Sequence, residues 1–382
     1  MTDVAVVGAG IVGAATAYEL ARRGAAVTLV DRGEVSGGTT GLGEGNVLCS
    51  DKDAGPELEL AKLGLAAYDD VEALLGAEAK LRRKGALIVH RDADTWTSEP
   101  ARVARLQAAG VEARLVAPEE VPALEPELTG ALYGASFFPR DLQCAPREIA
   151  RGLTREAAVL GARVLTGCEV SAIEVRGGRV AGLLTRGGDN GIGGDAVVLA
   201  AGAWSAALAA TAGLRLPVEP RWGQLLQLAM PPGRSDPFIR HKVVDGSYMG
   251  SVLSSDAGLQ VTTVLETTSD GRVLVGSSRS RRGFDTAVDE SVSTSMLRRA
   301  ERLMPGLEAL RTERAWAGLR PWLPDNLPAI GPSSAADGLW VATGHEGAGV
   351  ALGPITGRLI AQALCGEPAD TDLAPFDPDR FA

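Results

Sequence analysis

The chain has 382 residues, more than one typical hydrophobic core organises, so about two domains are expected. Its 48 acidic residues outnumber its 38 basic residues and give a net charge of −10. This balance argues against a nucleic-acid groove or an anionic membrane surface as the main partner and favours a small molecule. No apolar run approaches the roughly 20 residues of a membrane span, and the first predicted strand starts almost at Met1. We therefore expect no transmembrane segment, no signal peptide and a cytoplasmic protein.

An apolar strand at residues 4–7 runs directly into a Gly-x-Gly-x-x-Gly turn formed by Gly8, Gly10 and Gly13. Gly8 allows a tight turn, Gly10 allows backbone N–H groups to approach a pyrophosphate, and Gly13 allows the next helix to pack closely on the strand. The phosphates would lie at the N-terminus of that helix, where unpaired N–H groups and the helix dipole favour an anion. The motif therefore predicts a dinucleotide-binding βαβ unit.

The residues after this turn complete the unit. A helix at residues 14–23 leads to a strand at residues 27–30, which ends at Asp31, eighteen residues beyond Gly13. A carboxylate at this distance is expected to accept hydrogen bonds from an adenosine ribose. The same fingerprint occurs in NAD-dependent dehydrogenases, and a glycine-rich βαβ unit can also bind nothing, so the rest of the chain must decide the cofactor.

The next segment, residues 36–46, is rich in glycine and carries Thr39, Thr40, Glu44 and Asn46. Such a loop can wrap closely around a flat ligand. Its position directly after the predicted ribose carboxylate favours contact with the cofactor over a flexible surface loop.

The remaining elements are predicted from periodicity and turn residues. Helices are expected at residues 56–75, 99–109, 147–160, 290–304 and 350–364, and strands at 85–89, 163–165, 169–175, 179–185, 196–199, 224–228, 260–266, 272–276 and 339–342. Residues 163–185 are interpreted as a small antiparallel meander, and residues 111–127 as connecting structure on the surface. The strand at 196–199 is expected to return to the first sheet, and residues 217–279 are the candidate second domain.

Four cysteines, Cys49, Cys144, Cys168 and Cys365, are scattered without Cys-x-x-Cys spacing. Neither a zinc site nor a ligand set for an iron–sulfur cluster is predicted, so no metal is expected.

Four segments carry a resemblance to a known family: residues 8–13 with Asp31, residues 200–205, residues 316–321 and residues 344–349. In this order they resemble the D-amino-acid oxidase superfamily of FAD-dependent amine and amino-acid oxidoreductases, which includes glycine oxidase and sarcosine oxidase. The resemblance covers nearly the whole chain. It implies an α/β (α+β) two-domain fold with a Rossmann-like FAD-binding domain and a β-rich substrate domain. The FAD-binding domain is predicted at residues 1–81, 139–216 and 317–382, and the substrate-binding domain at 82–138 and 217–316.

Within the superfamily, residues 39–46 and 344–349 look most like the flavin subunits of D-hydroxyproline dehydrogenase, dye-linked proline dehydrogenase, opine oxidase and hydrogen cyanide synthase. Those relatives work in complexes that carry further flavin or iron–sulfur groups, whereas glycine and sarcosine oxidases react directly with oxygen. This closer resemblance implies partner subunits.

The resemblance also implies that FAD lies extended, with its adenine beside Asp31 and Val170 and its isoalloxazine held by residues 41–46 and 344–350. The helix that opens near Gly349 directs its N-terminal dipole at the part of the flavin where negative charge collects on reduction. The predicted FAD-binding residues are Gly8, Gly10, Ile11, Val12, Gly13, Asp31, Arg32, Thr39, Thr40, Gly43, Glu44, Gly45, Asn46, Val170, Ala201, Gly202, Trp204, Gly318, Gly344, His345, Glu346, Gly347, Ala348, Gly349 and Val350.

Sarcosine oxidases attach their flavin to a cysteine in the C-terminal half of the chain. Here Cys365, late in the last predicted helix, is the only cysteine after Cys168. The FAD is therefore expected to be bound without a covalent bond.

Three residues are predicted to serve the substrate. Arg320 matches the family arginine that binds the substrate carboxylate, and a guanidinium offers two parallel N–H donors to a planar anion. A structural salt bridge is the alternative. The family oxidases also place a tyrosine on a substrate-domain strand, but Val264 stands near that position, so Tyr248 is the predicted substitute. His345 is placed near the flavin, in catalysis or in positioning the backbone.

Two further features have open interpretations. Trp222 could line the substrate pocket, although an aromatic residue in a strand is more often part of the core. Arg279, Arg281 and Arg282 form a basic cluster that we interpret as a solvated face rather than a partner contact.

Together these features predict an FAD-dependent amino-acid or imino-acid dehydrogenase or oxidase. Its substrate would be a small D-amino acid, glycine, proline or hydroxyproline, and a hydride would pass from Cα to flavin N5. The alternative is an electron-relay subunit of a heteromeric dehydrogenase with little catalysis of its own. An NAD-dependent dehydrogenase is disfavoured by the C-terminal glycine turn and by the lack of a separate nicotinamide domain.

Overall fold

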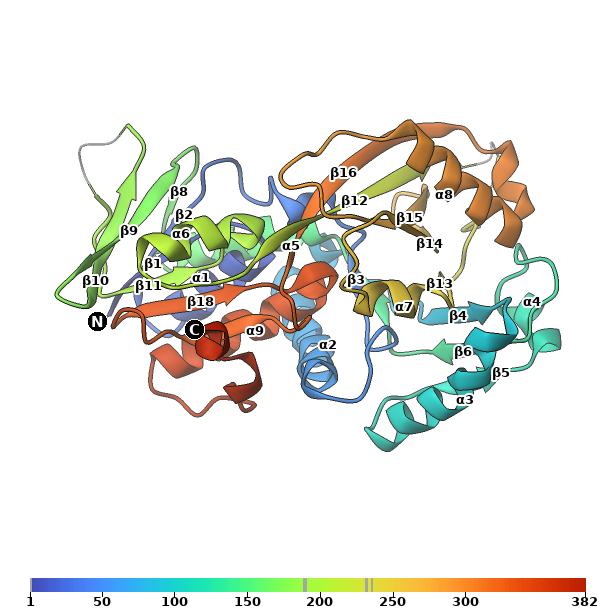
Figure 1. Ribbon diagram of the computed structural model, residues 1–382, viewed down its shortest axis with the longest axis horizontal. Coiled ribbons are helices and arrows are strands. Elements are labelled where there is room, and N and C mark those ends of the chain that lie inside the picture. Colours follow the sequence, from blue (N-terminus) through green and yellow to red (C-terminus); the bar gives the residue numbers. More distant parts are fainter. Residues whose placement is uncertain (1, 188–190, 231–232, 235) are drawn as a thin grey trace.

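Two large sheets organise the computed structural model, which describes residues 2–187, 191–230, 233–234 and 236–382. A six-stranded, mostly parallel sheet and an eight-stranded mixed sheet occupy opposite ends of the elongated molecule (Figure 1). Both chain termini lie at the end that holds the six-stranded sheet. The mixed α/β architecture confirms the predicted fold class.

The six-stranded sheet has the order β17-β18-β11-β1-β2-β8. Its strands are β1 (Asp3–Val7), β2 (Ala26–Val30), β8 (Arg163–Leu165), β11 (Ala196–Leu199), β17 (Ala329–Pro332) and β18 (Leu339–Thr343). All neighbours are parallel except β17 and β18. Because helices cover a parallel sheet, its central strands are apolar on both faces, and every residue of β11 is buried.

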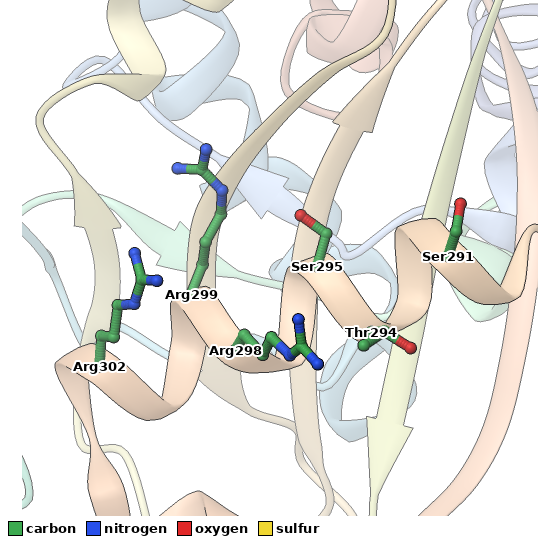
Figure 2. A pocket seen from close by; sticks show the side chains of 6 residues that line it. All are labelled: Ser291, Thr294, Ser295, Arg298, Arg299 and Arg302. Atoms are coloured by element: carbon green, nitrogen blue, oxygen red, sulfur yellow. The ribbon is translucent and has the colours of Figure 1, made fainter.

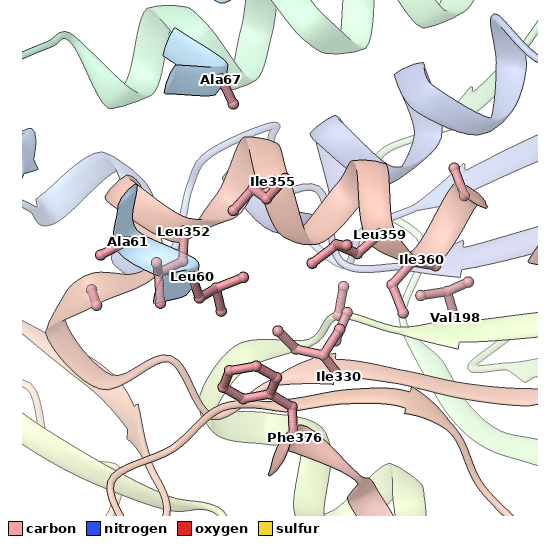
Figure 3. Close-up of a cluster of buried hydrophobic side chains, with 14 of the residues drawn as sticks. Leu60, Ala61, Ala67, Val198, Ile330, Leu352, Ile355, Leu359, Ile360 and Phe376 are labelled. Atoms are coloured by element: carbon pink, nitrogen blue, oxygen red, sulfur yellow. The ribbon is translucent and has the colours of Figure 1, made fainter. Parts of the chain in front are cut away.

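The helix α9 (Gly349–Leu364) packs between the six-stranded sheet and α2 (Pro56–Leu75), and it also packs against α1 (Ile11–Ala21). Figure 3 shows its apolar side chains within this core, among residues from α2 and from the sheet. The contact with α1 is very close at Gly357, where a Cβ atom would lie 2.5 Å from the Ala15 carbonyl carbon. The packing of α9 thus holds the helix that follows the first glycine turn.

Other elements surround this sheet. The helix α5 (Pro146–Val159) packs on α1, and α6 (Ser205–Thr211) packs on β9 (Val170–Arg176), which forms an antiparallel pair with β10 (Arg179–Thr185). Two short strands, β3 (Asn46–Val47) and β7 (Leu142–Gln143), form a separate antiparallel pair.

The eight-stranded sheet has the order β16-β12-β15-β14-β13-β4-β6-β5. Its strands are β4 (Ala86–His90), β5 (Arg114–Val116), β6 (Gly134–Phe138), β12 (Glu219–Leu228), β13 (Lys242–Asp245), β14 (Gln260–Thr267), β15 (Val273–Arg279) and β16 (Thr312–Trp322). The helix α8 (Glu290–Leu303) packs on it through Val292, Met296, Ala300 and Leu303, which recur at helical spacing.

The smaller helical elements complete the chain. They are the helices α3 (Ala93–Ala108), α4 (Val121–Leu124) and α7 (Tyr248–Leu253), and the 3₁₀ turns η1 (Thr39–Leu42), η2 (Gly76–Ala79), η3 (Pro118–Glu120), η4 (Gly202–Trp204), η5 (Pro305–Ala309), η6 (Glu346–Ala348), η7 (Ala374–Phe376) and η8 (Pro378–Phe381). None of the helices in the described ranges combines the length and the apolar character needed to cross a bilayer.

Several predicted elements differ from those observed. Residues 163–165 do not join the antiparallel meander but form β8, which pairs in parallel with β2. Residues 111–127 are not only surface connection, because β5 lies within them and pairs with β6. The helix predicted at 99–109 starts earlier, at Ala93, where the Asp92 side chain accepts a hydrogen bond from the Asp94 N–H group. In each case the pairing or capping partner decides the structure, and hydrophobic periodicity does not reveal it.

The strand β16 pairs with β12 along almost its full length, from Thr312 to Trp322. The predicted boundary between residues 316 and 317 therefore falls inside one continuous strand. The domain limits stay a prediction. In the chain, β16 of the eight-stranded sheet leads directly to β17 of the six-stranded sheet.

Candidate active site

A cavity of about 1130 Å³ lies where the two sheet systems meet. It is lined by the ends of β1 and β2, by residues 37–46, by β12 and β16, and by the turn that precedes α9. Its volume exceeds that of typical small-molecule sites, which reach about 1,000 Å³, and suits a dinucleotide together with a substrate.

Nearly all the predicted FAD-binding residues line this cavity. The exceptions are Gly13, Gly344 and Ala348. Gly13 instead lies against the first turn, because a Cβ atom there would come within 1.8 Å of the Gly8 carbonyl oxygen. Gly344 adopts a φ of +81° and packs against Leu323. These glycines shape the backbone from outside the cavity.

The first glycine turn presents backbone to the cavity. Gly8 has a φ of +107°, which L side chains rarely adopt. The Ala9 N–H group donates to the Asp31 carboxylate at 2.7 Å, and the Ile11 N–H group donates to the Thr40 hydroxyl at 3.0 Å. Gly10 lines the cavity without a side chain. A pyrophosphate can therefore approach the start of α1 closely, and this geometry fits the phosphates of FAD.

The loop at residues 39–46 is held against the strand β16. The Thr39 hydroxyl donates to the Leu319 carbonyl at 2.5 Å, and the Trp316 indole N–H donates to the Leu42 carbonyl at 2.9 Å. Glu44 pairs with Lys242 of β13 at 2.6 Å and accepts a hydrogen bond from Asn46. These contacts fix a glycine-rich loop that would otherwise lose much conformational freedom on binding a ligand.

Glu44 belongs to a buried row of alternating charges. Lys242 lies 3.9 Å from Glu266, which pairs with Lys84 at 2.7 Å. Burial alone would raise the pKa of Glu44, but Lys242 outweighs it and holds that pKa below its ordinary value. Burial would lower the pKa of Lys242, but Glu266 and Glu44 raise it overall. Both groups are therefore charged at neutral pH.

Arg320 reaches the cavity from β16, with 17% of its side chain exposed. Its position depends on Gly223 of β12, where a Cβ atom would lie 2.1 Å from the Arg320 Nη1 atom. Nη1 donates to the Ser278 carbonyl at 3.1 Å, and Nε lies 4.0 Å from the Glu346 carboxylate. Among the described residues no other hydrogen bond to this guanidinium is present, so N–H donors remain available to an anion in the cavity.

Tyr248, at the start of α7, also lines the cavity, and its ring lies 4.6 Å from the Arg279 guanidinium. Val264, which stands near the family tyrosine in the sequence, is buried in the core. The tyrosine that lines the cavity is therefore Tyr248 of the helix α7, and not a residue of a substrate-domain strand as in the family oxidases.

His345 lies in the turn before α9, and its Nε2 atom is 3.0 Å from the Thr356 hydroxyl. The ring is buried, and burial lowers its pKa to about 3. A histidine that is neutral and bound to α9 suits positioning of the turn better than proton transfer to a substrate.

The charged cluster behind Arg320 was not predicted. Arg279 is fully buried, so its interpretation as part of a solvated face is wrong, while Arg281 and Arg282 are partly exposed. Arg221 is also buried and stands opposite Arg320 in the pairing of β12 with β16. Only the pairing register of β12 with β16 places Arg221 next to Arg320, and the two residues are 99 positions apart in the sequence. Trp222 belongs to the core and not to the cavity wall.

An aromatic stack forms part of the cavity lining. The Arg32 guanidinium lies 4.0 Å from the Trp204 ring, and the Trp204 ring stacks on Phe284 with centroids 5.6 Å apart. All three residues line the cavity, although Phe284 comes from the segment between β15 and α8. The stack therefore joins the two sheet systems beside the predicted adenosine end.

A second hollow lies on the outer surface of α8 (Figure 2). Its lining comes from this one helix and consists of Ser291, Thr294, Ser295, Arg298, Arg299 and Arg302. It contains none of the glycine turns and is separate from the cavity described above.

The cysteines are placed away from the substrate end. Only Cys168 of the four lines the cavity, and its N–H group donates to the Asp31 carbonyl. Cys365 caps the C-terminus of α9 on the surface. No group of three or more His, Cys, Asp or Glu residues suited to a metal ion occurs in the described ranges. Non-covalent binding of FAD stays a prediction.

Comparison with known proteins assigns the class. A family model described as FAD dependent oxidoreductase matches residues 3–363, so the chain belongs to this family. The predicted relationship to the D-amino-acid oxidase superfamily is thereby confirmed. FAD is the cofactor, and the residues around the first glycine turn fit it.

Particular relatives refine this class. A glycine oxidase of Pseudomonas aeruginosa is 32% identical over 98% of this chain and 98% of that protein. Hydrogen cyanide synthase subunit HcnC of the same organism is 28% identical over 99% of this chain and 96% of that protein. The crystal structure of glycine oxidase from Geobacillus kaustophilus covers 100% of this chain and 99% of its own, with a TM-score of 0.88 and 28% identity. The protein is an FAD-dependent amino-acid oxidoreductase.

Proposed function

We propose that this enzyme oxidises the Cα–N bond of a small amino or imino acid to an imine, which water hydrolyses unless it is cyclic. The observation that carries the proposal is Arg320, whose guanidinium faces the same cavity as the glycine turns and keeps N–H donors available. Bound FAD supplies the acceptor for the two electrons and the hydrogen that leave Cα.

The chain's own residues bind and orient the substrate. Arg320 would hold the carboxylate through two parallel N–H donors, which fixes Cα in one place and orientation. Tyr248 supplies a hydroxyl on the same side of the cavity. The turn at His345 and Glu346, tied to α9 through Thr356, would lie beside Arg320, since the Glu346 carboxylate is 4.0 Å from Arg320 Nε.

No strong base is needed for this reaction if the enzyme selects the neutral amine. The buried carboxylates Glu44 and Glu346 both have pKa values below the ordinary range, because Lys242 and the nearby arginines outweigh the effect of burial. Neither is poised to take a proton near neutral pH.

An anaerobic titration of the FAD-loaded protein with amino and imino acids tests the proposal. We expect at least one of glycine, N-methylglycine, proline, hydroxyproline, aspartate and glutamate, tested as both enantiomers where these exist, to bleach the 450 nm band stoichiometrically. A flavin that none of these compounds reduces, but that dithionite reduces, would instead favour an electron-relay subunit. The absorbance spectrum of the purified protein also checks that FAD, and not NAD, is bound.

The electron acceptor is a separate question. The likeness of residues 39–46 and 344–349 to dehydrogenase subunits predicts that dye reduction is faster than hydrogen peroxide formation. Peroxide formation in air that equals substrate turnover, with no added acceptor, would make the enzyme an oxidase and its predicted partner subunits unnecessary. The partner subunits and the cytoplasmic location remain predictions.

A further inference from the structure

Three guanidinium groups converge on one carboxylate at the substrate end of the cavity. The Glu346 Oε1 atom lies 3.6 Å from Arg221 Nη1, 3.7 Å from Arg279 Nε and 4.0 Å from Arg320 Nε. The strands β12, β15 and β16 supply the arginines, and the turn before α9 supplies the glutamate. Within this cluster, three positive charges share a single negative charge.

The cluster is buried and incompletely paired. Only 2% of the Arg221 and Arg279 side chains is exposed. Arg279 Nε and Glu346 Oε1 have no hydrogen-bond partner among the residues that the structure describes. Glu346 also holds a φ of +45°, a left-handed conformation that is unfavourable for a non-glycine residue and persists only where its surroundings enforce it. Its other carboxylate oxygen accepts from the Gly347 N–H group.

The remaining contacts of the arginines are neutral. Arg221 donates to the carbonyls of Ser251 and Ser254 at 3.2 and 2.9 Å, at the end of α7. Arg279 donates to the Ser251 hydroxyl and lies against the Tyr248 ring. Carbonyls, a hydroxyl and an aromatic face reduce the cost of burying a cation but do not cancel its charge.

Other acidic groups nearby are already paired. Asp51, which stabilises the charge of Arg279 at longer range, pairs with Lys52 at 3.2 Å, and Glu57 pairs with the same lysine at 3.2 Å. Glu44, beside Arg320, pairs with Lys242. Burial lowers the pKa of Arg221 to about 10, and the neighbouring arginines add to this shift against the pull of Glu346. The pKa of Arg279 is raised despite its burial, by Tyr248 and Glu346, so Arg221 is the member of the cluster whose charge further negative charge would stabilise most.

We propose that the substrate carries two acidic groups. This inference rests on the proposed function: one carboxylate, next to the amine, binds Arg320. The second, on the side chain or on the amine nitrogen, lies beside Tyr248, which lines the cavity together with Glu346. Arg279 and Arg221 do not line the cavity but lie directly behind these two residues. Three guanidinium groups would then face Glu346 and two substrate carboxylates, so the charges balance. Acidic amino acids and imino-dicarboxylic acids have this chemistry.

Matched pairs of substrates test the proposal in the wild-type FAD-loaded enzyme. The rate of anaerobic flavin reduction divided by the dissociation constant is compared for aspartate with asparagine, glutamate with glutamine, and iminodiacetate with its monoamide. We expect the acid to exceed its neutral isostere by about 30-fold or more in at least one pair, because the buried positive charge behind Glu346 and Tyr248 attracts a second carboxylate and not an amide. Equal or better reduction by the neutral isosteres or by glycine and proline would overturn the inference and leave the proposed function intact.

A variant assigns the effect to the cluster. Arg279→Gln removes one positive charge and should reduce the acid-to-amide ratio by about tenfold or more. Arg282→Gln is the matched control, since it removes a charge three residues further along, where the arginine pairs with Asp289 at 3.3 Å. The control should keep the wild-type ratio, and an equal loss in both variants would contradict a specific role for the cluster.

A binding measurement keeps the proposal testable if Arg279→Gln does not fold. Malonate and succinate should perturb the flavin spectrum of the wild-type enzyme at concentrations about tenfold lower than acetate and propionate, because each dicarboxylate can occupy both anion positions. Equal dissociation constants for the two kinds of acid would overturn the inference. Tight dicarboxylate binding without flavin reduction by any amino acid would count against the proposed function rather than against the second anion site.

Discussion

The two ends of the cavity differ in what they offer a ligand. The end formed by β1, β2 and α1 offers backbone N–H groups and glycines. The end under β12, β15 and β16 offers charged side chains. The first end depends on where the backbone can come close, as Gly8 and Gly10 show. The second depends on which side chains strand pairing brings together, as Arg221 and Arg320 show. We therefore expect backbone geometry to bind the cofactor that the family shares, and side chains to select the particular substrate.

The largest expected effect would break the backbone end. Gly10→Val should abolish FAD retention while the protein stays folded, because the side chain would occupy the space where the backbone must meet the pyrophosphate. Within the protein the nearest atom to a Cβ at Gly10 is the Thr40 hydroxyl oxygen at 3.1 Å, so the fold tolerates the change better than the ligand does. The measurement is the ratio of absorbance at 450 and 280 nm in purified protein, with circular dichroism to check folding.

Two companion substitutions sharpen this result. Gly193→Ala, where a Cβ atom meets open space, should keep FAD as the wild type does. Gly13→Val should fail to fold, because a Cβ atom there would clash with the Gly8 carbonyl oxygen. A yellow Gly10→Val protein with normal FAD content would contradict the assigned position of the pyrophosphate.

A substitution at the charged end should leave the cofactor in place. Removing one partner of a buried, hydrogen-bonded charge pair costs roughly 2–5 kcal/mol, so Arg320→Ala should lower kcat/KM by about 30-fold to several thousand-fold with an unchanged flavin spectrum. Arg320→Lys should restore little, since an ammonium group cannot reproduce the planar fork. Turnover of an amine without a carboxylate should change far less. Unchanged kcat/KM for the amino acid in Arg320→Ala would remove the main support for the substrate class.

The contrast between the two ends also explains what the sequence could predict. The first βαβ unit and its ribose carboxylate are local patterns, so Gly8, Gly10 and Asp31 could be assigned from spacing alone. Arg279 could not, because a run of arginines near a strand end is usually solvated, and only its contacts with Tyr248 and Ser251 of α7 show how it is buried. Similarly, the sequence assigned residues 163–165 to the wrong sheet. Their parallel pairing with β2 joins residues more than 130 positions apart, which no local pattern reveals.

The turn between the two ends should respond to acid. His345 has a pKa lowered by burial to about 3, whereas in the unfolded chain it would titrate near its ordinary value of 6.5. The unfolded state therefore binds more protons between these values, so this group's contribution to stability is present above about pH 6.5 and is lost as the pH falls towards 3. His345→Gln should lose less stability than the wild type between pH 7 and pH 5, measured by urea unfolding of the FAD-loaded proteins.

The test compares the change of unfolding free energy with pH in the wild type with the same change in His345→Gln. The substitution also removes the contact with Thr356, which lowers stability at every pH alike, so only the difference in slope reports the histidine. Parallel pH profiles for the two proteins would show that His345 does not stay neutral in the folded state.

The smallest expected effect concerns the stack that joins the two sheet systems. Phe284 is 54% exposed, yet it stacks on Trp204, and both rings line the cavity beside Arg32. An aromatic pair of this kind contributes about 0.5–1.5 kcal/mol and would hold Trp204 in its place in the cavity wall, so Phe284→Leu should raise the FAD dissociation constant by at most roughly two- to tenfold while keeping the site apolar. The constant is measured from the fluorescence of released FAD. Leu259→Ala is the control, because Leu259 is similarly exposed but lies outside the cavity lining, and it should bind FAD as the wild type does. A weakening of FAD binding that is equal in both variants would mean that the stack adds nothing specific. Weakening in Phe284→Leu alone would show that a residue between β15 and α8, on the side of the eight-stranded sheet, helps to hold the cofactor bound by the glycine end.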